Sequence, residues 1–266
     1  MSYVPDSHEW SILITALATG VLILSTHVPL GRQVLRRGII FIDLAIAQIA
    51  ALGVMIAAIR GWQDSVVAVQ AAAGAAAAIG ALFMTWSERH WPQMQEAIIG
   101  ATFVVAASVS LLLLAGNPQA GEHLQEILAG QILWISWSDL APALVVYLPV
   151  LVLWFALGHR LGKVGFYLLF AAVVTISVQL VGIYLVFASL ILPALATRSL
   201  LAAYLIGLTG YAAGLYASSA LDLPAGPAIV CGLTAVTILA GLVRHEHNRF
   251  RPAGHKSRPA DAKKSA

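Results

Sequence analysis

The stretch that decides the fold runs from residue 164 to residue 197 and reads VGFYLLFAAVVTISVQLVGIYLVFASLILPALAT. It contains 34 residues and no Asp, Glu, Lys or Arg. A hydrocarbon core about 30 Å thick is crossed by roughly 20 helical residues, so this stretch is too long for one upright helix and just long enough for two short ones. Lys163 precedes it and Arg198 follows it. If both bases lie on the same side of a membrane, the stretch crosses the membrane twice.

Intervals of membrane-crossing length recur along the rest of the chain. Each predicts one transmembrane helix. Together with the two helices of residues 164–197 they predict nine crossings. The intervals are Trp10–Gly31, Gly38–Ile59 (interrupted by Asp43), Ser65–Ser87, Ala97–Gly121, Leu140–His159, Ser199–Leu221 and Leu223–Val243.

The basic residues predict which way round the chain is inserted. With the N-terminus outside and the C-terminus in the cytoplasm, 14 of the 15 Lys and Arg residues fall in cytoplasmic segments, and only Arg60 lies outside. An acidic outer face attracts cations; alternatively, acids merely occupy the side from which bases are excluded. The acids expected outside are Asp6, Glu9, Asp64, Glu122, Glu126, Asp139 and Asp222.

Composition points to one membrane domain with little outside it. The chain is 60% hydrophobic and 10% charged, whereas soluble domains carry about 25% charged residues. We expect a transmembrane domain over residues 1–243 and a basic, disordered cytoplasmic tail over residues 244–266. The sequence has no nucleotide-binding loop, because Gly162-Lys163 lacks the spacing and the Ser or Thr of that motif. We therefore expect a transport subunit without enzymatic activity of its own, with ATP hydrolysis on another chain.

Small and amphipathic segments complete the pattern. The Ala-rich run from Ala71 to Gly80 and the glycines Gly207, Gly210 and Gly214 predict closely packed helices. Residues Glu122–Leu133 have apolar side chains at helical spacing, which predicts an amphipathic segment along the outer interface.

Several segments, in the same order along the chain, resemble the integral-membrane permeases of zinc, manganese and iron ATP-binding-cassette (ABC) importers. Each segment alone is a weak signal, but their order and topology are specific. The likeness covers about residues 25 to 243. The segments are His27–Gly31, Phe41–Asp43 through Gly53, Glu96–Gly100, Leu128–Leu133 with Ser136–Leu140, Val181–Val186 running to Leu192–Arg198, and Leu221–Gly226.

The resemblance implies an all-α membrane protein, a polytopic bundle of about 8–9 transmembrane helices like the permease of a type II ABC importer. It implies transport of a divalent metal ion, with no permanently bound cofactor and no nucleic acid partner. It further implies a homodimer in the lipid of the bacterial inner membrane, served by a separate ATP-binding subunit and an extracytoplasmic metal-binding protein. The segment that resembles the ATPase-coupling arm is short and consists of Gly158, His159, Arg160, Leu161, Gly162 and Lys163.

Three residues are candidates for the metal path: Asp43, Gln48 and Gln179. Asp43 lies six residues beyond Arg37, about 9 Å into the second crossing by helical rise, where an acid is costly and is functional by default. The alternative is an Asp near a helix N-terminus, paired with Arg36 or Arg37. Family members typically place a His four residues after this Asp, where this chain has Ala47. Further ligands must then come from other helices, where Thr175, Ser177 and Ser189 are also available.

Two other functions remain open at this point. One is an ATP-independent secondary transporter or channel for a cation, and the other is a membrane scaffold without transport activity. The sequence does not select among zinc, manganese and iron.

Overall fold

The computed structural model describes residues 7–62, 64–114, 132–157 and 160–249, and this part of the chain forms helices and turns without a strand. The α-helices are α1 (Ser7–Arg37), α2 (Ile42–Ile59), α3 (Val66–His90), α4 (Gln95–Leu114), α6 (Trp137–Leu157), α7 (Gly162–Val181), α8 (Ile183–Ala196), α9 (Leu200–Leu221) and α10 (Ala225–Arg249). Two 3-10 helices, Pro92–Met94 and Ile132–Trp134, precede α4 and α6.

Among the described residues, eight helices are long and apolar enough to cross a membrane, and α8 is a ninth, shorter apolar helix. The all-α polytopic fold expected from the sequence is therefore confirmed. The division of residues 164–197 into two helices is also confirmed, because α7 ends at Val181 and α8 begins at Ile183. Gly182 between them has φ 79° and ψ 164°, a conformation that only glycine adopts readily.

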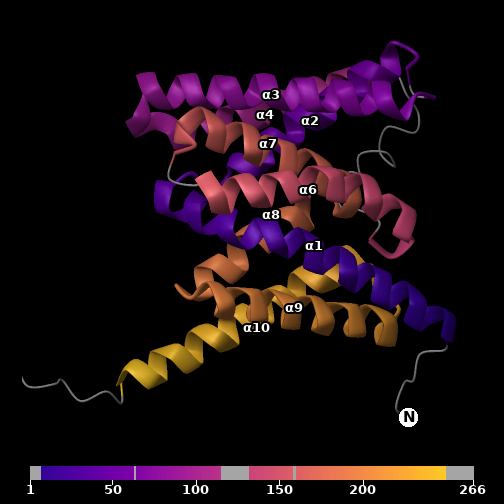
Figure 1. Ribbon diagram of the computed structural model, residues 1–266, viewed down its shortest axis with the longest axis vertical. Helices are drawn as coiled ribbons and strands as arrows, with labels where there is room; N and C mark the ends of the chain where they lie inside the picture. Colours follow the sequence, from indigo (N-terminus) through magenta and orange to yellow (C-terminus); the bar gives the residue numbers. More distant parts are fainter. Residues whose placement is uncertain (1–6, 63, 115–131, 158–159, 250–266) are drawn as a thin grey trace, which may run out of the picture.

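The helices lie side by side across the view in Figure 1, with α3 and α4 at the top and α9 and α10 at the bottom. Their alternating directions bring most of the described bases to one end of the bundle. We call the end with Arg36, Arg37, Arg89, Arg160, Lys163 and Arg198 the basic end. We call the end with Asp64, Asp139 and Asp222 the acidic end.

Exposed tryptophans mark both ends of the bundle. Trp86 and Trp91 are exposed near the basic end, and Trp62, Trp134 and Trp137 near the acidic end. Tryptophan is enriched at both membrane–water interfaces because its ring is apolar and its N–H is polar. The two groups therefore delimit the apolar band that the bilayer surrounds.

Small residues allow the helices to approach closely, as the sequence predicted. A Cβ on Gly53 of α2 would lie 2.6 Å from the carbonyl oxygen of Ala72 in α3. A Cβ on Gly214 of α9 would collide with Ile229 Cα of α10. In contrast, a Cβ on Gly74, inside the Ala-rich run, would meet nothing within 4 Å, so that glycine borders open space.

Polar side chains inside the bundle are paired between helices. Tyr147 of α6 hydrogen-bonds Ser177 of α7, and Ser189 Oγ of α8 lies 2.7 Å from Tyr211 Oη of α9. Because a bilayer supplies no partner to a polar group, such pairs hold helices together across the membrane.

The structure differs from the sequence expectation at the start of the second crossing. Residues Gly38–Phe41 form a turn instead of continuing a helix from Arg37, and Gly38 has φ 68°. Asp43 therefore lies in the first turn of α2, not about 9 Å along a helix that began at Arg37. The spacing argument was wrong because it counted this turn as helix.

Two other expectations fall partly outside the described residues. Helix α10 continues past Val243 to Arg249, and the rest of the predicted tail is not described. Of the predicted amphipathic segment Glu122–Leu133, only Ile132 and Leu133 are described, in a 3-10 helix.

Because α9 and α10 are in close contact, a larger side chain between them should destabilise the fold. Gly214→Val should destabilise the protein by about 1–3 kcal/mol, because the new side chain overpacks against Ile229. Thermal unfolding of the detergent-solubilised protein measures this. Gly241→Val on α10 is the matched control, because a Cβ there meets nothing within 4 Å. Equal unfolding temperatures for the two variants would contradict the prediction.

Candidate functional site

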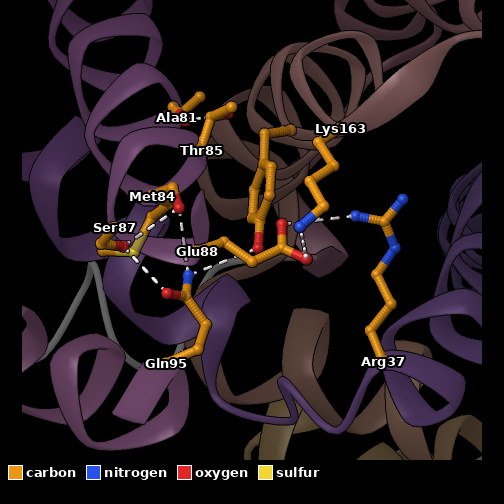
Figure 2. Close-up of polar contacts among 9 residues, drawn as sticks. Arg37, Ala81, Met84, Thr85, Ser87, Glu88, Gln95 and Lys163 are labelled. Atoms are coloured by element: carbon orange, nitrogen blue, oxygen red, sulfur yellow. Dashed lines mark hydrogen bonds and ion pairs between the residues drawn. The ribbon is translucent and has the colours of Figure 1, made fainter. Parts of the chain in front are cut away.

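At the basic end, one carboxylate joins three helices. Arg37 at the end of α1 and Lys163 at the start of α7 both approach the carboxylate of Glu88, which lies near the end of α3 (Figure 2). Lys163 Nζ is 3.1 Å from Glu88 Oε1, and Arg37 Nη1 is 3.7 Å from Glu88 Oε2. In this ion triad, the side chains of Glu88 and Arg37 are 16% and 21% exposed, whereas that of Lys163 is 45% exposed. Water therefore screens the pair of Glu88 with Arg37 less than the pair with Lys163.

Neighbouring side chains hold the ion triad in place. The guanidinium of Arg37 lies over the ring of Phe166 in α7, with Cζ 4.2 Å from the ring centroid, a favourable cation–π arrangement. Gln95 at the start of α4 donates to the carbonyl oxygen of Met84 at 3.1 Å and accepts from Ser87 Oγ at 2.9 Å. Its amide also lies 3.4 Å from Tyr167 Oη in α7. Helices α3, α4 and α7 are thereby connected beside the triad.

The predicted coupling segment is directly attached to this triad. Its residues Gly158 and His159 lie outside the described part of the chain, whereas Arg160, Leu161, Gly162 and Lys163 are described. Arg160 is exposed, and Gly162 begins α7 with φ 60°. Lys163 contacts Glu88 within the bundle. Arg160 thus presents a charge to the surroundings, and Lys163 links the segment to α1 and α3.

Asp43 lies in the first turn of α2, also at the basic end. It is 1% exposed, and neither of its carboxylate oxygens has a hydrogen-bond partner among the described residues. Arg37 is engaged with Glu88 instead, so the pairing of Asp43 with Arg37 that the sequence allowed is not made. Glu96 of α4 accepts from the backbone N–H of Phe41 at 3.3 Å, and its other oxygen is buried and unpaired. Two acids with unpaired oxygens thus stand where α2 and α4 begin.

The other two candidates for the metal path line different cavities. Gln48 borders a mostly apolar cavity of about 740 Å³ between α2, α4, α8 and α10, and its Nε2 donates to Ser110 Oγ at 3.3 Å. Gln179 borders a cavity of about 730 Å³ between α3, α6 and α7, near the acidic end, and accepts from Gln70 Nε2. Asp43 lines neither cavity. The structure therefore does not bring the three candidates together.

The hydroxyl groups considered as further ligands differ in whether they are already hydrogen-bonded. Ser177 and Ser189 are paired with tyrosines in the core, whereas the hydroxyl of Thr175 is buried without a partner among the described residues. No group of three or more His, Cys, Asp or Glu side chains that could hold a metal occurs in the described ranges.

Sequence reasoning missed Glu88, Glu96 and Gln70. Glu88 follows a charge-free interval and directly precedes Arg89, and no role was predicted for it. An acid among the bases of the inner side was the signal that could have found it, since such an acid needs a basic partner when buried.

Comparisons with known proteins agree with this architecture. The chain is 29% identical over 260 residues to the manganese transport system membrane protein MntC of Halalkalibacterium halodurans, covering 87% of this chain and 86% of that protein. Its fold matches the solved structure of PsaBC from Streptococcus pneumoniae in complex with a Fab, with a TM-score of 0.68 at 20% identity. That match covers 86% of this chain and 90% of the other.

The sequence profile of the ABC 3 transport family matches residues 9–166 and 156–244, which together span nearly all of the described structure. The resemblance inferred from the short motifs is thereby confirmed. The chain belongs to the ABC 3 transport family, as an integral-membrane permease of the metal-ion ABC transporter class.

Proposed function

We propose that this permease forms the translocation path of an ATP-driven importer for divalent metal ions of the Zn²⁺, Mn²⁺ and Fe²⁺ class. It acts as a homodimer in the bacterial inner membrane, with the acidic end outside and the basic end in the cytoplasm. A separate ATPase docks at the basic end, and an extracytoplasmic binding protein delivers the metal at the acidic end. The manganese transporter subunit among its relatives supports Mn²⁺ as one substrate.

The observation that carries the coupling part of this proposal is the ion triad of Arg37, Glu88 and Lys163. A separate ATPase can only drive the helices if the segment it contacts is joined to them. Lys163 belongs to the candidate coupling segment, and through Glu88 it is joined to α3 and α1. Force applied at Arg160 therefore reaches α7 through the backbone, and α3 and α1 through the ion triad.

Two acids with buried, unpaired oxygens support a cationic substrate. Asp43 and Glu96 place unpaired carboxylate oxygens at the cytoplasmic starts of α2 and α4. An ionised carboxylate buried without a partner is costly, and a passing divalent cation offsets that cost. We assign Asp43 to the metal path on this ground, with Glu96 beside it.

The function itself is tested by metal analysis of cells with and without the gene. Deletion should lower the cellular content of one of the three metals, and the intact gene should restore it. The permease should also co-purify with an ATPase. Unchanged metal content would overturn the proposed transport. Metal uptake that persists without any ATPase would instead indicate an ATP-independent transporter.

Two charge reversals in the coupling segment should impair the permease for different reasons. Arg160→Glu should lower co-purification of the ATPase by about tenfold, or about 1.4 kcal/mol, with a normal amount of folded permease, because Arg160 is exposed. Lys163→Glu should lower the amount of folded permease, because it places a second carboxylate beside Glu88. Adding Glu88→Lys to that variant should restore it.

The control for the first arm is Arg60→Glu, the same change at an exposed position of the acidic end. It should leave co-purification unchanged. If Arg60→Glu and Arg160→Glu weaken the ATPase interaction equally, docking at the basic end is wrong.

Asp43→Asn should reduce metal uptake by at least about tenfold while the amount of folded protein in the membrane stays the same. The amide keeps the size of the side chain but removes the charge that a cation needs. Uptake of radioactive Mn²⁺ or Zn²⁺ into cells measures the effect. Full uptake by the Asn variant would make Asp43 a structural residue.

A further inference from the structure

The cavity at the acidic end, between α3, α6 and α7, is lined by several polar side chains. It has a volume of about 730 Å³, and its polar lining consists of Gln70, Asp139, Thr175 and Gln179. The rest of the lining is apolar or glycine, and no Lys, Arg or His is part of it. The cavity thus offers oxygen ligands and one negative charge, without a base that would repel a cation.

Thr175 is the residue of this lining whose buried hydroxyl lacks a hydrogen-bond partner among the described residues. Hydroxyl side chains in these helices usually donate to the carbonyl oxygen of the preceding turn, as Thr19 and Thr85 do at 2.9 Å. Thr175 is 4% exposed, and its Oγ1 makes no hydrogen bond with any described residue. Thr237 of α10 is in the same state but lines neither cavity. A buried polar group left unpaired calls for an explanation such as a bound water or ion.

Gln179 extends the same polar face towards the acidic end. It stands four residues after Thr175 on α7, and residues at this spacing lie on one side of a helix. Thr175 lies about 9 Å below the end of α7 by helical rise, and Gln179 lies close to that end. Gln179 therefore lies near the acidic end of the cavity, and Thr175 lies one helical turn deeper in the bundle.

Gln70 of α3 faces Gln179 across the cavity. Its Nε2 donates to Gln179 Oε1, which brings the two amides into contact and leaves Gln70 Oε1 without a described partner. Amide oxygen and nitrogen positions are assigned from hydrogen bonding, and a turn of one amide presents both carbonyl oxygens to the same point. A cation between α3 and α7 would favour that arrangement.

Asp139 supplies the charge. Its Oδ2 accepts from the backbone N–H of Ser136 at 2.8 Å and from Ser136 Oγ at 2.6 Å. These bonds fix the carboxylate at the start of α6, while Oδ1 accepts no hydrogen bond from a described residue. A fixed carboxylate with a free oxygen is pre-organised to hold a cation.

We propose that this cavity binds a partly hydrated, hard divalent cation such as Mn²⁺ through oxygen ligands of Gln70, Asp139, Thr175 and Gln179. Carboxylate, carbonyl and water ligands suit Mn²⁺, whereas Zn²⁺ is usually held by imidazole or thiolate. One charge and neutral oxygens give weak binding, which lets the ion move on. The inference rests on the proposed transport function and deepens it, because it names where the substrate first binds and of which class it is.

Binding of Mn²⁺ to the purified full-length protein in nanodiscs tests this directly, because the electron paramagnetic resonance signal of free Mn²⁺ falls as the ion binds. Gln179→Leu and Asp139→Asn should each raise the Kd for Mn²⁺ by about tenfold or more. Ca²⁺, which binds oxygen ligands, should displace Mn²⁺ from the site. Failure of excess Ca²⁺ to compete with Mn²⁺ would overturn the oxygen-ligand site.

Filling the cavity provides a second arm with a matched control. Gly74 lines the cavity, and a Cβ there meets nothing within 4 Å, so Gly74→Leu should fold and should block Mn²⁺ binding. Gly241→Leu adds the same side chain to open space on α10, away from the cavity, and should bind Mn²⁺ normally. Unchanged binding in Gly74→Leu, or equal loss in both leucine variants, would overturn the proposal.

The binding assay contains no ATPase and no transport step, so its outcome is separate from that of the metal analysis of cells. If the cavity binds Mn²⁺ and deletion leaves cellular metal unchanged, the site stands and the transport function falls. If deletion lowers cellular metal and no cavity variant alters Mn²⁺ binding, the transport function stands and the site falls.

Discussion

A hydrocarbon interior offers no hydrogen-bond partner to a polar group, and most of this structure follows from that constraint. The backbone satisfies it by forming helices. Side chains satisfy it by pairing between helices, as Tyr147 does with Ser177 and Ser189 with Tyr211. Against this background the groups left unpaired stand out. Asp43 and Thr175 are buried side chains whose oxygens have no hydrogen-bond partner among the described residues, and one oxygen of the partly exposed Glu96 is in the same state. These groups are the basis of both proposed cation sites.

The fold could be predicted because membrane insertion depends on simple, additive properties of the sequence. The length of each apolar interval and the positions of Lys and Arg were enough to place the helices. Even the break in residues 164–197 was predictable from charge, since an even number of crossings had to separate Lys163 from Arg198. The glycine at the break supplies a backbone conformation that the pattern alone did not require.

The site was less predictable because it depends on which helices are neighbours. Gln179 was a candidate from its polarity, but its partner Gln70 lies 109 residues away in sequence. Glu88 could be recognised as a link only once the end of α1 and the start of α7 were seen beside it. Asp43 was singled out as the charge inside an apolar interval, and the structure shows it buried. Its depth was misjudged because a turn at Gly38 cannot be told from helix by counting charges. Pairings between distant segments leave no local signal in one sequence.

Helix α8 has a consequence for how the protein responds to its lipid. Its 14 residues extend about 21 Å, well short of a bilayer core, yet most of them are buried against α1, α9 and α10. Arg32 of α1 donates to the carbonyl oxygen of Arg198 at 2.7 Å and ties the end of this crossing to the bundle. Neighbouring helices, not acyl chains, therefore set the length of α8. A change in acyl-chain length produces hydrophobic mismatch at exposed helices such as α6, while the thickness of the protein at α8 stays constant.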